Sequence, residues 1–146
     1  MRFNVFTDYC LRTLIYLGST AENSQATRAE VAQAYGISDN HLMKVVHWLA
    51  SEHYIESMRG RGGGIRLARE PQSINIGELV RKSEGDFYLV ECFEPGAFRC
   101  RIESGCQLKA VLYEALEAMY QVLDRYTLAS LLQDRKTLIH LLELPL

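Results

Sequence analysis

Apolar residues recur at helical spacing in the opening stretch of the chain. Leu11, Leu14 and Ile15 lie three or four positions apart, which places them on one face of an amphipathic helix. Thr7 precedes them with a hydroxyl that can cap the first turn, and Gly18 marks the expected end. The pattern therefore predicts a first helix that begins near Thr7 and ends near Gly18.

Two further helices are predicted close behind the first. Thr27 and Glu30 have the spacing of a capping box, which starts a helix over residues 28–35 that stops at Gly36. Ser38 is the expected cap of the next helix. The apolar face of that helix consists of Leu42, Val45, Val46 and Leu49. Two capped helices joined by a turn that contains glycine predict a helix-turn-helix.

A glycine-rich hairpin follows the helix pair. Residues 54–58 and 65–68 read as two short strands, and the segment between them is Arg-Gly-Arg-Gly-Gly-Gly. A simple surface turn is one alternative. A nucleotide-binding loop is another, but the segment lacks the Gly-Lys-Ser/Thr ending and precedes a strand. We favour a wing, so the expected fold class is mainly α with a small β wing, a winged helix-turn-helix.

The second half of the chain predicts a short helix near residues 77–81, one long helix, and a tail over 126–142 with an amphipathic turn or two. The long helix carries an apolar stripe at Leu108, Val111, Leu112, Ala115, Leu116, Met119, Tyr120 and Leu123. It could pack on its own domain or, as we expect, on the same helix of a second subunit in a homodimer. The chain then divides into a DNA-binding domain (1–82), a cysteine loop (83–107), and a dimerisation helix with its tail (108–146).

Composition is that of an ordinary soluble protein, with 48% apolar and 23% charged residues and a net charge of −2. No apolar run could span a membrane and no signal peptide is evident, so we expect a cytoplasmic location. Charge is concentrated locally, because Arg59, Arg61, Arg66 and Arg69 occur without an intervening acid. Such a patch favours contact with a phosphate backbone.

The helix-turn-helix and the wing supply the candidate contacts to double-stranded DNA with a palindromic operator. These candidates are Arg28, Ser38, Asn40, His41 and Lys44 on the helices, and Arg59, Arg61, Gly62 and Gly63 in the hairpin. The polar residues of the second helix could instead form a solvated face. His47 and Trp48 are expected to pack or flank rather than to contact DNA.

Three of the four cysteines lie close together, at Cys92, Cys100 and Cys106, in a stretch with Pro, Gly and polar residues. Such a loop can fold around a point, and three thiolates suit an iron–sulfur cluster or zinc. The absence of a Cys-x-x-Cys pair argues against structural zinc and against a ferredoxin-type carrier. Structural thiols and a redox switch stay open as alternatives. Cys10 is expected to be a buried free thiol.

The chain resembles the Rrf2 family of winged-helix regulators along essentially its whole length. The resemblance rests on FTDYCLRTLIYL, GISDNHLMKVV, RGRGGGIRLAR, INIGELVR and the three cysteines followed by CQLKAVLYEAL. Within the family, the chain is most similar to the nitric-oxide-sensing repressors. The resemblance implies a homodimer with an iron–sulfur cluster on each subunit, expected to be 4Fe-4S rather than 2Fe-2S, and no enzymatic activity.

The same resemblance implies a set of cluster ligands. Cys92, Cys100 and Cys106 match the cysteine ligands, and Asp8 matches an aspartate that can complete the coordination from the other subunit. Lys109 stands where a related cluster-homeostasis regulator has a ligand histidine, and the gap between Cys92 and Cys100 is longer than in the family pattern. The expected function is a repressor that releases DNA when nitric oxide nitrosylates its cluster. A sensor of iron–sulfur supply or redox state, and an iron–sulfur enzyme or electron carrier, are the alternatives.

Overall fold

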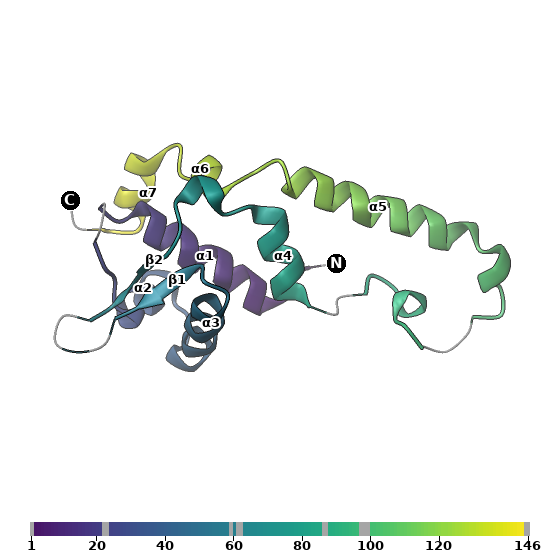
Figure 1. Cartoon of the computed structure of the whole chain (residues 1–146), viewed down its shortest axis with the longest axis horizontal. Helices are drawn as coiled ribbons and strands as arrows, with labels where there is room; N and C mark the ends of the chain where they lie inside the picture. Colours follow the sequence, from purple (N-terminus) through teal and green to yellow (C-terminus); the bar gives the residue numbers. More distant parts are fainter. Residues whose placement is uncertain are drawn as a thin grey trace.

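Three helices and a two-stranded sheet form the N-terminal part of the molecule, and one long helix extends away from them (Figure 1). The computed structural model describes residues 2–21, 24–58, 60, 63–85, 88–96 and 100–144. The N-terminal elements are α1 (Val5–Ser19), α2 (Arg28–Tyr35), α3 (Asp39–Ser51), β1 (Ile55–Ser57) and β2 (Ile65–Leu67). They are followed by η1 (Pro71–Ser73), α4 (Ile76–Glu84), η2 (Glu91–Phe93), η3 (Glu103–Gly105), α5 (Gln107–Leu123), α6 (Leu128–Leu131) and α7 (Arg135–Leu141). No described helix is long and apolar enough to cross a membrane.

The start of α1 differs from the prediction. The helix begins at Val5 and is capped by Asn4, whose side-chain oxygen accepts a hydrogen bond from the backbone N–H of Phe6 at 3.0 Å. Thr7 was the wrong cap, because it lies inside the first turn and is fully buried. The sequence holds two residues able to cap within four positions, and burial of Thr7 leaves the role to the exposed Asn4.

The caps of the next two helices are confirmed. Thr27 Oγ1 accepts a hydrogen bond from the backbone N–H of Glu30 at 3.2 Å, while the Glu30 carboxylate accepts from the Thr27 backbone N–H at 2.6 Å. Gly36 ends α2 in the left-handed conformation, with φ of 62°. Ser38 caps α3 through the backbone N–H of His41. The helix-turn-helix is therefore stabilised by the capping interactions and the glycine turn that the local sequence predicts.

The two strands pair antiparallel, in the register Ile55↔Leu67, Glu56↔Arg66 and Ser57↔Ile65. An isolated bridge between Ala26 and Ile65 adds the segment before α2 to the edge of this hairpin. The wing is thus attached to the helix-turn-helix through backbone hydrogen bonds, which confirms the winged helix.

The hydrophobic core lies among the N-terminal helices and the wing strands. Its fully buried members include Cys10, Leu14, Val31, Leu42, Val45, Leu49 and Tyr54. The tail returns to this core after α5, because Leu128 in α6 and Leu144 beyond α7 are buried in the same cluster. α5 behaves differently, since none of its residues is buried although all of it is described.

The end of α5 is fastened to α4. Arg81 donates two hydrogen bonds to the carboxylate of Asp124, at 2.6 and 2.7 Å, and its guanidinium lies 4.5 Å from the centroid of the Tyr120 ring. Asn75 donates to the backbone carbonyl of Asp124 at 2.7 Å. Gly77 leaves no room for a side chain there, because a Cβ would collide with the Asp124 carboxylate. This junction fixes the direction in which α5 leaves the winged helix.

Candidate DNA interface and cysteine segment

We call α3 the recognition helix. Its exposed face is formed by residues that lie about one or two helical turns apart along the chain. Asn40, Met43, Lys44 and His47 are all exposed and lie on the side opposite the buried Leu42, Val45 and Leu49. The exposure of Asn40 and Lys44 agrees with the prediction. No ion pair to Lys44 occurs among the described residues, so its ammonium faces solvent.

His47 and Met43 were missed as candidates on this face. His47 was expected to pack or flank, but its side chain is exposed in the middle of the recognition helix. Met43 is 47% exposed and could make apolar contact with a thymine methyl group. The helical spacing of Asn40, Lys44 and His47 would have been enough to find His47. Trp48 does pack, with its ring 5.5 Å from Phe6 and 6.2 Å from Tyr54.

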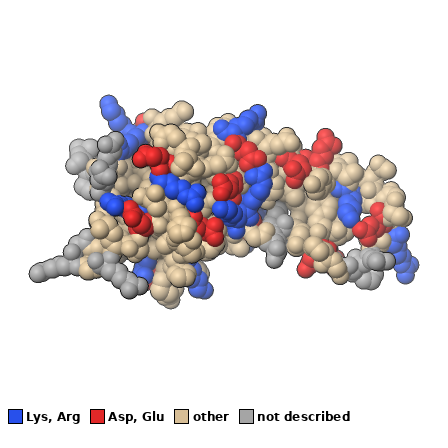
Figure 2. Space-filling view, in the orientation of Figure 1, with Lys and Arg blue, Asp and Glu red and all other residues tan. Residues whose placement is uncertain are grey.

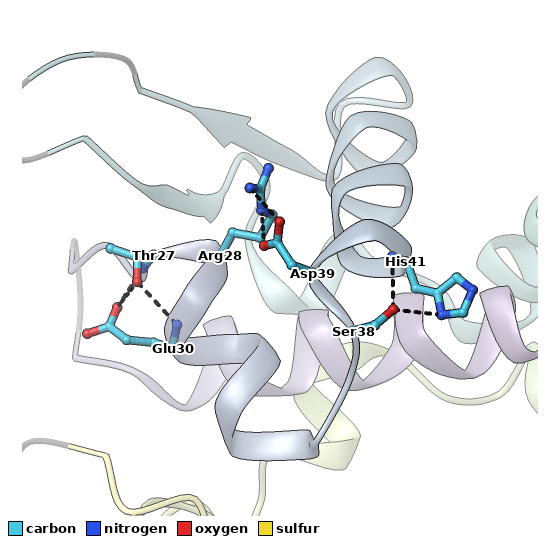
Figure 3. Close-up of polar contacts among 6 residues, drawn as sticks. All are labelled: Thr27, Arg28, Glu30, Ser38, Asp39 and His41. Carbon is cyan, nitrogen blue, oxygen red and sulfur yellow. Dashed lines mark hydrogen bonds and ion pairs between the residues drawn. The ribbon is translucent and has the colours of Figure 1, made fainter.

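The N-terminal end of the recognition helix carries two polar contacts (Figure 3). On one side, Ser38 Oγ lies 3.0 Å from Nδ1 of His41. On the other, Arg28 at the start of α2 donates from Nε and Nη2 to the two carboxylate oxygens of Asp39, at 2.7 and 3.0 Å. Arg28 is therefore held in an intramolecular ion pair, and Asp39 was not among the predicted residues.

The basic run of the wing is partly neutralised by its own hairpin. Arg66 pairs with Glu56 on the opposite strand at 2.6 Å. Arg69 donates to the backbone carbonyls of His53 and Glu52, both at 2.8 Å. A run without acid in the sequence therefore does not exclude an acid across the sheet, and Arg66 is neutralised in this way, whereas Arg69 is held by neutral carbonyls and keeps its charge.

The remaining wing candidates divide into one described residue and three that are not. Gly63 lies at the wing stem, where a Cβ would collide with the Met58 carbonyl, so only glycine fits. Arg59, Arg61 and Gly62 lie outside the described residues. On the face shown in Figure 2, acidic side chains lie between the basic ones across the middle of the molecule. Basic and acidic side chains are therefore mixed on this face, in keeping with the net charge of −2.

The cysteine segment, residues 88–96 and 100–106, lies beside α5. Cys92 is half-buried in η2, Cys100 is exposed, and Cys106 is the half-buried residue before the first turn of α5. The edge-on contact of Phe93 and Tyr113, with centroids 6.2 Å apart, packs the segment on the helix. All four cysteines are free thiols.

Lys109 is a cation that lies near two of these cysteines. Its ammonium donates to the Glu103 carboxylate at 2.8 Å. The pKa of Lys109 is raised, first by this hydrogen bond and to a smaller extent by the negative charge that the Cys92 and Cys106 thiolates carry when ionised. Cys92 and Cys106 therefore both lie within electrostatic reach of one cation. Within the described part of a single chain, however, no three His, Cys, Asp or Glu side chains come together as a metal site.

Cys10 is separated from the other thiols in both place and chemistry. It is fully buried in α1, and burial raises its pKa to about 12. A metal-binding cysteine must ionise, so this site favours an inert thiol.

Asp8 lies in the first turn of α1. Its carboxylate accepts a hydrogen bond from Arg12 Nε at 3.0 Å and pairs with Arg12 Nη2 at 2.9 Å. The two side chains are 46% and 44% exposed. The ion pair leaves the Asp8 carboxylate accessible to a second molecule. Among the described residues, the cysteine segment of the same chain does not come close to this carboxylate.

The chain matches the model of the Rrf2 family, described as iron-dependent transcriptional regulators, over residues 3–134. The chain belongs to the Rrf2 family. The HTH-type transcriptional regulator NsrR of Bacillus subtilis is 46% identical over 144 residues, which cover 99% of each chain. NsrR of Geobacillus kaustophilus is 46% identical over 143 residues, covering 98% of this chain and 97% of the relative.

Solved structures give the same result at lower identity. IscR of T. potens has a TM-score of 0.72 and 25% identity, covering 92% of this chain and 88% of the other. CymR, the global cysteine regulator of B. subtilis, has a TM-score of 0.70 and 26% identity, covering 90% and 95%. This Rrf2 protein is therefore a winged-helix transcriptional regulator, and its relatives are named as regulators rather than enzymes.

Proposed function

We propose that this Rrf2 protein is a repressor whose binding to DNA depends on an iron–sulfur cluster and ends when nitric oxide attacks that cluster. The observation that carries the proposal is the set of three free, accessible thiols at Cys92, Cys100 and Cys106 in a chain that is 46% identical to NsrR regulators over nearly its whole length. The alternative enzyme or electron carrier has no support in the family, whose relatives are named as regulators.

The donor chemistry of the cysteine segment fits an iron–sulfur cluster. Thiolate sulfur is the ligand that such clusters prefer, and Cys92 and Cys106 both lie within electrostatic reach of Lys109. Cys100 is exposed and free to join them. When bound, a cluster would supply iron that reacts with nitric oxide. We expect a 4Fe-4S rather than a 2Fe-2S cluster.

Asp8 is the proposed fourth ligand, contributed to the cluster of the other subunit. A carboxylate oxygen is a hard ligand and binds the soft iron of a cluster less tightly than a thiolate does. In this chain, ligation would require Asp8 to exchange its exposed ion pair with Arg12. Such an exchange costs little, because exposed ion pairs contribute roughly 0–1 kcal/mol. Asp8 lies on α1, which packs against α3, so a bond from it would orient the DNA-reading helix.

The uncovered stripe of α5 supports a homodimer. Leu108 is 62% exposed and Val111 59% exposed in the single chain. Exposed apolar area of this kind on a long helix is typical of a surface that another subunit covers. Pairing two copies through α5 would place two recognition helices for the half-sites of a palindromic operator.

DNA contacts are assigned to the recognition helix and the wing. Asn40, Lys44 and His47 are exposed where base edges and phosphates would lie, with Ser38 and His41 at the helix start. Gly63 shapes the wing stem, and Arg59, Arg61 and Gly62 are assigned to the wing from the sequence alone.

A regulator of iron–sulfur supply or redox state is the second candidate, favoured by the structural likeness to IscR and CymR. In this chain Lys109 occupies the position expected for a ligand histidine, and its ammonium, which donates to Glu103, has no lone pair to offer a metal. This difference favours the nitric oxide sensor.

One experiment tests the proposal and separates the candidates. The protein is purified without oxygen, and its absorbance spectrum and its binding to a duplex selected from a random-sequence pool are measured before and after nitric oxide. Before nitric oxide is added, the proposal predicts visible cluster absorbance and tight binding to the duplex. After nitric oxide, both should be lost, and this response should occur only in protein that carries the cluster. Binding that persists after nitric oxide has bleached the spectrum would refute nitric oxide sensing. Binding that follows cluster loading or oxidation but not nitric oxide would favour the second candidate.

A further inference from the structure

Asp39 places a carboxylate at the phosphate-facing end of the recognition helix. It is the first residue of α3, its side chain is 59% exposed, and it precedes the exposed Asn40. A lone negative charge here would repel a DNA backbone. A protein that reads DNA with this helix must therefore neutralise Asp39 or keep it away from phosphates.

Arg28 neutralises that carboxylate and keeps one amino group unused. It approaches side-on, so Nε and Nη2 each donate to one carboxylate oxygen, at 2.7 and 3.0 Å (Figure 3). Guanidinium has five N–H donors in a fixed plane, and this geometry leaves both hydrogens of Nη1. No hydrogen bond from Nη1 occurs among the described residues, and the Arg28 side chain is 42% exposed.

Arginine–carboxylate pairs in the described part of this molecule take two geometries, because Arg12 also approaches Asp8 side-on through Nε and Nη2, whereas Arg81 does not. Arg81 binds Asp124 end-on, through Nη1 and Nη2, and its face covers the Tyr120 ring. That pair uses both amino groups to fasten α4 to α5. Arg28 makes the contact that leaves an amino group directed elsewhere.

We propose that Arg28 and Asp39 act as one charge-compensated contact unit, in which Arg28 cancels the Asp39 carboxylate and donates from Nη1 to a phosphate of the bound duplex. The unit rests on the proposed DNA-binding function and adds Asp39 to it. Asp39 increases the effect of losing Arg28, because that loss removes a phosphate contact and also leaves an unpaired carboxylate beside the DNA backbone.

A double-mutant cycle tests the unit with the cluster-loaded, full-length protein. Arg28→Ala, Asp39→Ala and the double variant are compared with wild type for affinity to the selected duplex and to a random duplex, over a salt series. Arg28→Ala should weaken binding several-fold on both duplexes and lower the salt slope by about 1, the value for one phosphate contact. The double variant should bind several-fold more tightly than Arg28→Ala while keeping the lower slope. Asp39→Ala should bind at least as tightly as wild type with an undiminished slope.

The competing explanation is a clip that only joins α2 to α3. A clip predicts that Arg28→Ala and Asp39→Ala weaken binding equally, lower the midpoint of thermal unfolding together and leave the salt slope unchanged. That result, or a double variant that binds no better than Arg28→Ala, would overturn the contact unit. A wild-type protein that binds no duplex overturns both the unit and the proposed function. Binding that ignores nitric oxide defeats only the sensing proposal, because the slopes still decide the unit.

Discussion

The winged helix and the cysteine-bearing half of this molecule are built in different ways. In the winged helix, capped helices and a short sheet enclose a core of fully buried side chains such as Leu14, Leu42 and Tyr54. Along the cysteine segment and α5, every described side chain is exposed or half-buried. The first region completes its core within one chain, whereas the second leaves its apolar stripe and its thiols accessible.

This difference suggests how the work is divided. A region with a complete core keeps its shape without a partner, which suits a surface that must match DNA. A region without one takes its final form only when something else covers it, which suits a sensor. The two meet where Arg81 binds Asp124, so a change along α5 would reach the winged helix through α4.

Replacing the cysteines of the second region should have the largest effect. Replacing Cys92, Cys100 or Cys106 by Ala should abolish iron–sulfur incorporation, because each removes one of few available thiolates. Iron and acid-labile sulfide assays on anaerobically purified protein measure this. Cys10→Ala is the matched control and should retain the cluster, since Cys10 is buried with its pKa raised to about 12. A full cluster in any of the three segment variants would contradict the ligand assignment.

A charge on the stripe of α5 should break the proposed dimer. Val111→Glu places a carboxylate where the α5 helices of two subunits are proposed to be in contact, so the sedimentation coefficient should fall to that of a monomer. Ala110→Glu lies on the opposite side of the same helix and should leave the dimer intact. Equal behaviour of the two variants would mean that α5 does not form the interface.

Asp8 distinguishes a ligand from a helix-end charge. Asp8→Ala should retain a cluster on three cysteines but with a changed spectrum, and binding to DNA should depend less on the cluster. Asp8→Cys should react more slowly with nitric oxide. Stopped-flow absorbance measures both the cluster spectrum and the rate of its reaction with nitric oxide.

Arg12→Ala supplies the control for this prediction, because it removes the same ion pair and keeps the carboxylate. Its spectrum and nitric oxide kinetics should stay those of wild type. If Asp8→Ala and Asp8→Cys also match wild type, Asp8 is only a favourable charge in the first turn of α1, worth about 0.3–1 kcal/mol.

The smallest effect concerns the winged helix alone. Thr27→Ala removes the capping box of α2 and should lower the free energy of unfolding by about 1 kcal/mol. Cluster content should not change, because Thr27 lies in the region with its own core. Thermal unfolding and iron content measured on the same sample check both parts. Loss of iron in this variant would show that the two regions are not separable.

Local signals made most of the fold predictable. The Thr27–Glu30 box, Gly36 and the Ser38 cap are short-range patterns, and the structure contains each of them. The cap of α1 failed because Asn4 and Thr7 are both acceptable residues, and only burial decides between them. Helical periodicity likewise predicted α5, whose bounds Gln107–Leu123 enclose the whole apolar stripe.

The candidate site was less predictable, because its contacts join residues distant in sequence. Arg28 and Asp39 lie eleven positions apart, and Glu56 meets Arg66 only through strand register. His47 was expected to pack or flank together with Trp48, and in the structure only Trp48 packs. The ligand roles of Asp8 and the three cysteines remain predictions, since they concern a second subunit and a cluster.

Native mass spectrometry of the anaerobically purified protein tests the central claim most directly, because one spectrum reports both subunit number and cluster content. The account predicts a dimer that carries one iron–sulfur cluster per subunit, and a stepwise gain of nitric oxide mass on that dimer as nitric oxide is added. A monomer, a dimer that carries zinc, or a cluster-loaded dimer that gains no mass from nitric oxide would contradict it.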